Sequence, residues 1–209
     1  MSVATAEELF VEELKDIYSA EKQAVRAYPR LARSVQSDEV KEAMQEHLEQ
    51  TKQQVERLDR VFEILDKRAG GKTCDGMKGL LEEAFAHVEE IEDGPVRDAA
   101  LIGALQKVEH YEISAYGTVA TLAEAMGKDE IHQLLAETLQ EEKDTDQKLT
   151  EVAGTVNSEA LSESEEEEDD DLDDEADNEV DDEEESGEET GSRKTQKKPA
   201  PRSAKKTAR

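Results

Sequence analysis

The feature that most constrains the fold of this chain is the spacing of its apolar residues. In four long stretches they recur every three or four positions, which places their side chains on one face of an α-helix. Helix boundaries are marked by a Thr5-x-x-Glu8 capping box, by Ser37, by Pro95 and by glycines at 70–71 and 127. The sequence therefore predicts an all-α fold with long helices over about residues 6–34, 38–70 and 95–126, and a fourth from about 129 to beyond 152.

The lengths of the connections predict how these helices are arranged. The links "RSVQSDE" and "EAMGKDE" are short, so each joins two antiparallel neighbours. Residues 69–94 lie between the two hairpins and contain a shorter amphipathic helix, "MKGLLEEAFAHVEEI". Two helical hairpins joined by a long crossover form the ferritin-like four-helix bundle, here with an extra helix in the crossover. The alternative is an up-down bundle with a fifth helix docked outside.

The C-terminal part of the sequence has a different composition from the rest. Residues 159–189 contain 21 Asp/Glu and no Lys/Arg, whereas residues 193–209 contain 8 Lys/Arg and no Asp/Glu. Such segments bury too little apolar surface to offset the entropy of ordering, so we expect a helical domain over residues 1–157 and a disordered, acidic-then-basic tail over residues 158–209. The basic segment Arg193–Arg209 predicts at most weak, salt-sensitive binding of nucleic acid, and the alternative is a solubilising role.

Composition also bears on the compartment and excludes some functions. No apolar run approaches the roughly 20 residues that cross a bilayer, and the N-terminal residues do not have the layout of a secretory signal. The single cysteine, Cys74, has no partner for an intrachain disulfide. We therefore expect a cytoplasmic protein with no membrane partner.

Several carboxylates fall on helix faces that otherwise carry apolar residues. If Leu105 points inward, Glu109 and Glu112 lie within about 60° of it on the helical wheel, whereas His110 points away at about 140°. By the same test, Glu21 lies about 20° from Leu14. Glu142 lies about 40° from the centre of its inner face, with Glu141 and Asp146 nearer the flanks.

These polar residues also lie at matched heights in the predicted bundle. Glu112 precedes the turn at Gly127 by 15 residues and Glu142 follows it by 15. Glu21 and Gln50 lie at about the same distance on either side of the turn near residue 35, and His47, Thr51 and Gln54 lie around the level of Gln50. Four helices thus direct polar groups toward the middle of the bundle.

Ionised carboxylates buried together require a compensating positive charge. A pair of divalent ions would supply it, and carboxylate oxygens favour hard cations, iron or manganese, over the thiolate type of zinc site. The alternative is that each glutamate is hydrogen-bonded to a buried Tyr or Thr, for which Tyr18, Tyr116 and Thr51 are available. We interpret His47 as a half-buried spacer, and His87, His110 and His132 as residues at the surface or around the site.

Four segments of the chain resemble the YciE/YciF family of bacterial and archaeal stress proteins. They are "DIYSAEKQAVRAYPRLA", "HLEQTKQQVERLDRVFEIL", "VRDAALIGALQKVEHYEISAYGTVATLAEAMG" and "LAETLQEEKDTDQKLTEVA". The similarity covers about residues 5–153. It implies a ferritin-like, rubrerythrin-related fold, a homodimer and a di-iron or ferroxidase-like role. The family's inner polar residues correspond to Glu21, Gln54, Glu109, Glu112, Glu142 and Asp146.

The chain departs from the ferritin-like pattern in its second and fourth long helices. Neither contains the Glu-x-x-His usual in ferritin-like di-iron sites, and position 50 is Gln where relatives often have Glu. The candidate ligands are Glu21, Gln50, Gln54, Glu109, Glu112, Glu142 and Asp146, with no separate catalytic residue and no organic cofactor. The expected chemistry is oxidation of Fe(II) by O2 or peroxide. The alternative is a non-catalytic dimeric scaffold whose inner carboxylates bind no metal.

Overall fold

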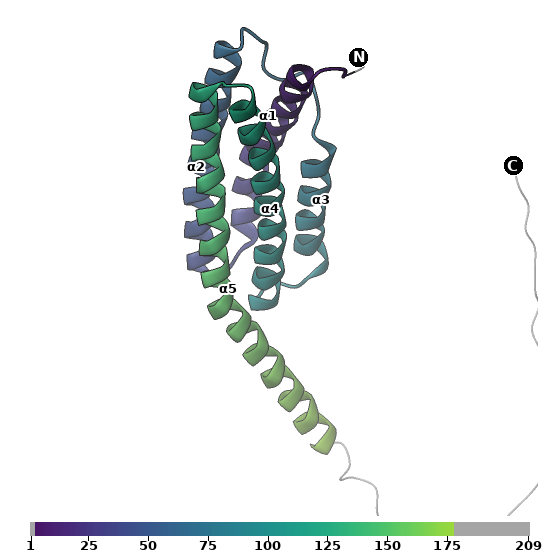
Figure 1. Ribbon diagram of the computed structural model, residues 1–209. Coiled ribbons are helices and arrows are strands. Elements are labelled where there is room, and N and C mark those ends of the chain that lie inside the picture. Colours follow the sequence, from purple (N-terminus) through teal and green to yellow (C-terminus); the bar gives the residue numbers. More distant parts are fainter. Residues whose placement is uncertain (1–2, 178–209) are drawn as a thin grey trace, which may run out of the picture. The chain divides into compact units, whose positions relative to one another are not determined.

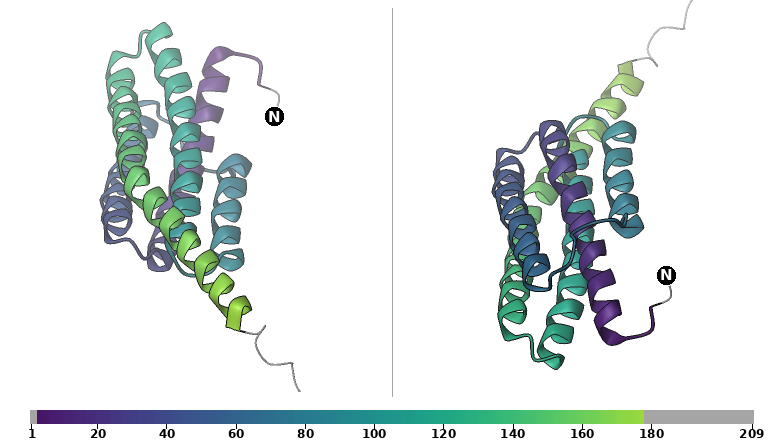
Figure 2. Two further views of the ribbon diagram at one scale, coloured as in Figure 1. Left: turned by 90° about the horizontal axis from the view of Figure 1, so that it is seen from below. Right: turned by 90° about the horizontal axis from the view of Figure 1, so that it is seen from above.

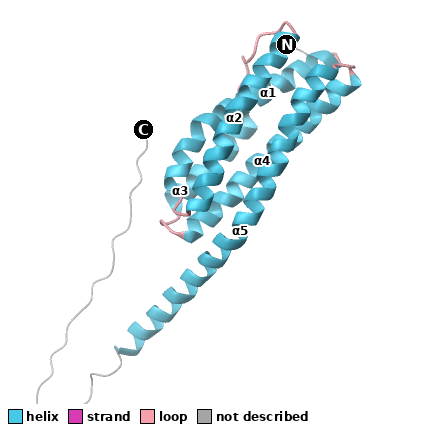
Figure 3. Ribbon diagram, turned by 90° about the vertical axis from the view of Figure 1, so that its left-hand side faces the viewer, coloured by secondary structure: helices cyan, strands magenta, loops and turns pink. Residues whose placement is uncertain are grey.

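The structure, a computed structural model, describes the backbone of residues 3–177 and the side chains of residues 3–162. Every regular element in that part of the chain is helical (Figure 3). The elements are α1 (Ala6–Leu31), a single 3-10 turn (Ala32–Ser34), α2 (Asp38–Ile64), α3 (Asp75–Glu90), α4 (Pro95–Ala125) and α5 (Asp129–Asp177). None of these helices is both long enough and apolar enough to cross a membrane.

The helices form the predicted ferritin-like bundle. Helices α1, α2, α4 and α5 lie side by side, and the connection from α2 to α4 returns along the bundle through α3, so that α2 and α4 point in the same direction (Figure 1). Helix α3 packs against α1 and α4 (Figure 2). The crossover helix is therefore part of the packed structure, and the all-α, ferritin-like prediction is confirmed.

Local hydrogen bonds explain why α1 begins, and why α4 begins and ends, close to the predicted positions, whereas α1 ends at Leu31 and only the 3-10 turn continues to Ser34. Thr5 and Glu8 form the reciprocal capping box, with N–H···O distances of 3.1 Å in both directions. Pro95 occupies the first turn of α4. Helix α4 ends at Ala125, and Gly127 just beyond it has a φ of 66°, which allows the Lys128 N–H to donate to the Ala123 carbonyl at 2.9 Å.

Helix α2 ends earlier than the expected Gly70-Gly71 signal. The last helical residue is Ile64, and the chain reverses at Asp66, whose φ is 51°. The Lys67 N–H then donates to the Phe62 carbonyl at 3.0 Å. Asp is one of the few residues besides Gly that adopt this left-handed conformation readily, so the helix stops before the glycine pair is reached.

Helix α5 continues past residue 157, where we expected the domain to end. Val156 is the last buried side chain among those described, and the Ser158 and Ser162 hydroxyls donate to the carbonyls one turn before them. No Gly or Pro follows Gly154 until Gly187, and Glu is a good helix former, so nothing in this sequence stops the helix at residue 157. The remainder of the predicted tail, residues 178–209, lies outside the described residues.

Candidate metal centre

A layer of polar residues divides the apolar core of the bundle in two. One apolar cluster contains Phe10, Leu14 and Ile17 of α1, and the other begins on the same helix at Ala20. The same division occurs on α2, α4 and α5. Between the two clusters lie buried polar side chains from all four helices: Glu21, His47, Thr51, Gln54, Glu109, Glu112, Thr138, Glu142 and Thr145. The helices thus bring their inward polar residues to one level of the bundle.

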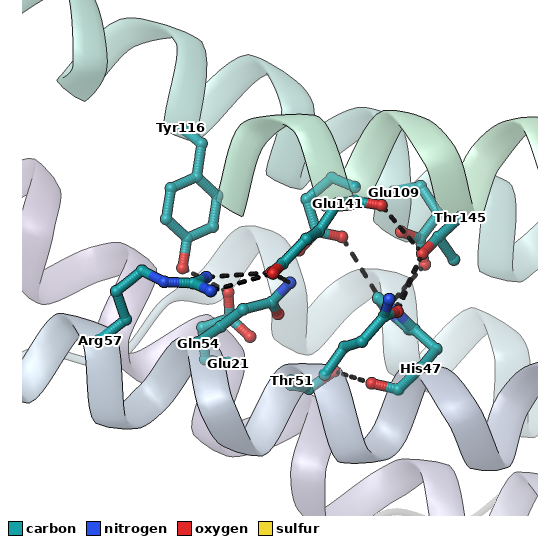
Figure 4. A network of polar contacts seen from close by, with 11 residues as sticks. Glu21, His47, Thr51, Gln54, Arg57, Glu109, Tyr116, Glu141 and Thr145 are labelled. Atoms are coloured by element: carbon teal, nitrogen blue, oxygen red, sulfur yellow. Dashed lines mark hydrogen bonds and ion pairs between the residues drawn. The ribbon is translucent and has the colours of Figure 1, made fainter. Parts of the chain in front are cut away.

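Four of these residues converge on one point. His47 of α2, Glu109 and Glu112 of α4 and Glu142 of α5 are all buried, and each offers a ligand atom within 4.8 Å of the others. The His47 Nε2 atom lies 3.2 Å from Glu109 Oε1 and 3.9 Å from Glu142 Oε2. Imidazole nitrogen and carboxylate oxygen are ligands for iron, manganese and zinc, so this group could hold a metal ion. Figure 4 shows the surrounding network from close by.

Most carboxylate oxygens in this group have no hydrogen-bond partner in the described part of the chain, apart from the ion-pair contact of Glu109 with His47. Both oxygens of Glu109, both of Glu142 and one of Glu112 are buried without one, as is the Nε2 atom of His47. An unpaired buried hydrogen-bond acceptor destabilises a fold by roughly several kcal/mol. Most buried acceptors in native proteins therefore have a partner. A bound cation would satisfy these oxygens together, and the donor set therefore fits a metal site.

Burial changes the proton affinity of the group. Burial raises the pKa of Glu112 and of Glu142 well above the usual range, and neighbouring carboxylates raise both further. Burial also raises the pKa of Glu21 to about 7. Burial lowers the pKa of His47, but the nearby Glu109 carboxylate outweighs this effect and the pKa is raised overall. Without metal, the group retains protons at neutral pH, and metal binding would displace them.

Hydrogen bonds orient the His47 ring toward the carboxylates. The Thr145 hydroxyl donates to the Glu141 carbonyl at 3.1 Å and lies 3.2 Å from His47 Nδ1. The Gln50 Oε1 atom lies 3.5 Å from the same nitrogen. Both neighbours can accept a hydrogen bond from Nδ1–H. Nε2 then points at Glu109, where it carries a proton in the metal-free protein and would offer its lone pair to a bound cation. A metal-binding histidine is commonly oriented in this way by the partner of its other nitrogen.

His47 corrects the sequence interpretation, which treated it as a half-buried spacer. The structure buries it to 5% exposure and points it into the carboxylate group. The signal was present in the sequence, because Met44, His47, Thr51 and Gln54 follow one another at the three- and four-residue spacing of a helix face. The expectation of a Glu-x-x-His pattern gave this lone histidine too little weight.

Glu21 lies beside the group and is already hydrogen-bonded. Its Oε1 atom accepts a hydrogen bond from the Tyr116 hydroxyl at 2.6 Å, while Oε2 has no partner (Figure 4). The hydrogen-bonded alternative thus holds for one oxygen of Glu21, and the other oxygen is free for a cation.

The remaining candidate ligands lie around the group or away from it. Gln54 is buried and donates to Glu141 at 3.1 Å, leaving its own oxygen unpaired, and Gln50 contacts the back of the His47 ring. Asp146 is only partly buried, and its carboxylate contacts His110 at 3.2 Å and Gln106 at 3.4 Å. The structure therefore brings the glutamates together and places Asp146 on the outer side of α5.

A positively charged side chain at the edge of the polar layer, that of Arg57, was not predicted from the sequence. The Arg57 side chain is 12% exposed and binds Glu141 through two nitrogens at 3.0 and 2.9 Å (Figure 4). It also contacts Thr138 and Glu137. Glu141 is thereby neutralised by the protein. In the described part of the chain, no lysine or arginine forms an ion pair with Glu109, Glu112 or Glu142.

Comparison with known proteins gives consistent matches over this helical region. Residues 5–162 match the family described as "Domain of unknown function (DUF892)". The chain is 49% identical over 162 residues to Protein YciF of Escherichia coli (strain K12), which covers 77% of this chain and 98% of that protein. The crystal structure of the E. coli stress protein YciF matches with a TM-score of 0.73 and 48% identity, over 75% of this chain and 99% of that one. YcfI from Rhodopseudomonas palustris matches with a TM-score of 0.70 and 40% identity, over 71% and 95%.

Proposed function

Because the chain belongs to the DUF892 family and is a homologue of YciF, we propose that it serves in a stress response as an iron-binding protein. Two ions, iron or alternatively manganese, would occupy the polar layer, where Fe(II) is oxidised by dioxygen or peroxide. The proposal also includes a cytoplasmic homodimer. Weak nucleic-acid binding by residues 193–209 stays a prediction about residues outside the described part.

The unpaired oxygens of Glu109 and Glu142 are the observation that carries this proposal. They are buried beside His47, whose Nε2 atom faces them, and this arrangement is unfavourable unless protons or cations are present. Four ionised glutamates, with Glu21 included, carry the charge that a pair of divalent ions balances. Homology alone would not distinguish this site from an ordinary polar layer.

At such a site, individual residues of this chain would have different roles. Glu109 and Glu112 of α4 and Glu142 of α5 would supply oxygen ligands, and His47 a nitrogen ligand. Bound Fe(II) would supply the electrons that reduce dioxygen or peroxide. Burial raises the pKa of Glu21 to about 7, although the hydrogen bond from Tyr116 lowers it, so this residue can hold or release a proton near neutral pH.

The test is an anaerobic titration of metal-stripped protein with Fe(II), followed by admission of air. Near-ultraviolet absorbance should rise and saturate near two irons per chain. The double variant Glu109→Gln/Glu112→Gln should lose this signal, whereas Glu151→Gln, an exposed change on α5, should retain it. Binding that is unchanged in the double variant would refute the proposed site. Saturation near one iron per chain would refute the proposed pair of metal ions.

The second candidate is a non-catalytic scaffold whose inner glutamates are protonated or hydrogen-bonded and bind no metal. It is favoured by one observation, the hydrogen bond from Tyr116 to Glu21, which stabilises the layer without metal. This candidate predicts no saturable Fe(II) binding by the wild-type chain. It also predicts glutamate carboxyl resonances that titrate well above the usual range whether or not metal is added.

A further inference from the structure

A surface hollow between α2 and α5 lies directly outside the polar layer. Its volume is about 110 Å³, and it is lined by Glu46, Gln50, Asp144 and Lys148, together with residues that also line a second cavity. The hollow therefore carries two acidic side chains, one amide and one lysine at the outer surface of the bundle. Glu46 and Asp144 are both exposed.

A smaller cavity, of about 10 Å³, lies inward of this hollow and touches Glu109. That volume is about enough for one water molecule or one partly dehydrated ion. The two cavities share four lining residues: Ala43, His47, Thr145 and Leu149. The surface hollow therefore adjoins the cavity that touches the inner carboxylate.

Two neighbouring parts of the bundle are less suited to the entry of a small cation. Helix α3 packs over α1 and α4. Farther along the seam between α2 and α5, the Arg57 guanidinium fills the space beside Glu141 and Thr138 and would repel a cation. The level of His47 and Thr145 differs, because there the side chains are an imidazole, a hydroxyl and an amide that can exchange hydrogen bonds.

We propose that divalent cations reach the inner carboxylates through this hollow, and that His47 passes them from Gln50 and Thr145 to Glu109. Rotation of the imidazole would break only the contacts of Nδ1 with these two neighbours. Lys148 forms an ion pair with Glu46 across the mouth of the hollow and thereby restricts access. This inference rests on the proposed metal binding. It adds to it an entry route for the cation and two residues that control this route, His47 and Lys148.

The rate of metal binding can be measured separately from its extent. The chain has no tryptophan and four tyrosines, of which Tyr28 and Tyr116 are buried near the layer. Co(II) that arrives there should quench tyrosine fluorescence. Stopped-flow mixing of metal-free protein with Co(II) then gives the loading rate. The final amplitude, measured over a series of Co(II) concentrations, gives the affinity. Neither readout depends on oxidation chemistry.

Ala43→Leu should fill both cavities without altering any proposed ligand. We expect it to slow loading by about tenfold or more, because close-packed interiors admit small ions only through space that already exists, while the affinity changes little. Ala43→Ser is the matched control and should load like the wild type. If Ala43→Leu folds, as judged by circular dichroism, and still loads at the wild-type rate, the route is wrong.

Lys148→Glu tests the mouth of the hollow with a change at the surface. It should speed loading severalfold at low ionic strength, because it removes the ion pair and adds negative charge that attracts cations. Lys143→Glu makes the same change at an exposed position of α5 outside the hollow and should have no such effect. Equal effects of the two variants would overturn the role of Lys148. A wild-type chain without saturable quenching would overturn both the route and the proposed function.

Discussion

His47 on α2 and Glu109 on α4 face each other across the interior of the bundle, with 3.2 Å between Nε2 and Oε1. The Nδ1 side of the ring faces Thr145 and Gln50. Apart from this contact with His47, neither oxygen of Glu109 has a hydrogen-bond partner among the described residues. The ring therefore joins a hydrogen-bonded outer side to an unpaired inner side, which is the relation expected of a histidine positioned to bind a cation.

Removal of the imidazole should weaken metal binding more than it weakens the fold. We expect Thr145→Val, which removes only the neighbour of Nδ1, to reduce Co(II) affinity by about tenfold to a hundredfold, and His47→Ala, which removes the ligand itself, to reduce it further. Titration followed by tyrosine fluorescence measures both. His132, which contacts the Ala120 carbonyl, provides the control, and His132→Ala should bind like the wild type. An unchanged affinity for His47→Ala would exclude this residue as a ligand.

Arg57 should contribute to stability through its contacts with Glu141. Arg57→Ala leaves that carboxylate only partly exposed and without its cation, so we expect a loss of about 1–2 kcal/mol in the free energy of unfolding, an amount reduced by solvent screening. Arg60 lies one turn farther along α2, is exposed and pairs with Glu63 and Glu130. Arg60→Ala should change stability by less than about 0.5 kcal/mol. Urea denaturation of both variants decides whether the buried position matters.

Much of the fold could be predicted because its signals are local. Helical periodicity, the capping box at Thr5 and the glycine at 127 each act within a few residues, and loop lengths then restrict how the helices pair. The early end of α2 was missed because Asp66 supplies by itself a conformation that usually requires glycine.

The site could be predicted less completely, because it depends on contacts between helices. Counting residues from the turns placed Glu21, Glu112 and Glu142 at one level, and the structure brings them to one polar layer. Counting could not show that Arg57 turns inward beside Glu141, or that Asp146 turns outward to His110. Side-chain direction at the flank of a helix depends on its neighbours, and no spacing rule contains that information.

Asp98 should be essential to the turn between α1 and α2, although it lies 61 residues or more away along the chain. It is 2% exposed, and its carboxylate accepts hydrogen bonds from the backbone N–H groups of Gln36 at 3.0 Å and Ser37 at 2.6 Å. We expect Asp98→Ala to lower the free energy of unfolding by about 2–3 kcal/mol, because both donors lose a charged acceptor. Asp98→Asn keeps one acceptor and should lose about half as much. Equal stability of Asp98→Ala and the wild type in urea denaturation would contradict this role.

The stability of the metal-free protein should fall as the pH rises through neutrality. The pKa of Glu21 is raised to about 7, and those of Glu112 and Glu142 are raised well above the usual range, mainly by burial. A carboxyl whose pKa is higher in the folded state binds protons more tightly there, so its stabilising effect is complete below about pH 4.5 and is lost as the pH rises through the folded value. We expect the free energy of unfolding to decrease by roughly 3 kcal/mol between about pH 5 and about pH 7.5.

Amide substitution in the layer tests this pH dependence and its link to metal. Glu142→Gln removes one titrating group and should make the metal-free protein more stable than the wild type at neutral pH, with a flatter pH profile. The same variant should gain little stability when Fe(II) or Mn(II) is added, whereas the wild type should gain about 2–4 kcal/mol once metal is in large excess over its dissociation constant. Urea denaturation at about pH 5 and about pH 7.5, with and without metal, gives the four free energies of unfolding that are needed for each protein. Glu151→Gln, an exposed change on the same helix, should follow the wild type throughout. A wild-type stability that rises with pH in the absence of metal would show that the inner glutamates are ionised and balanced by other charges, and the case for a cation in the layer would fail with it.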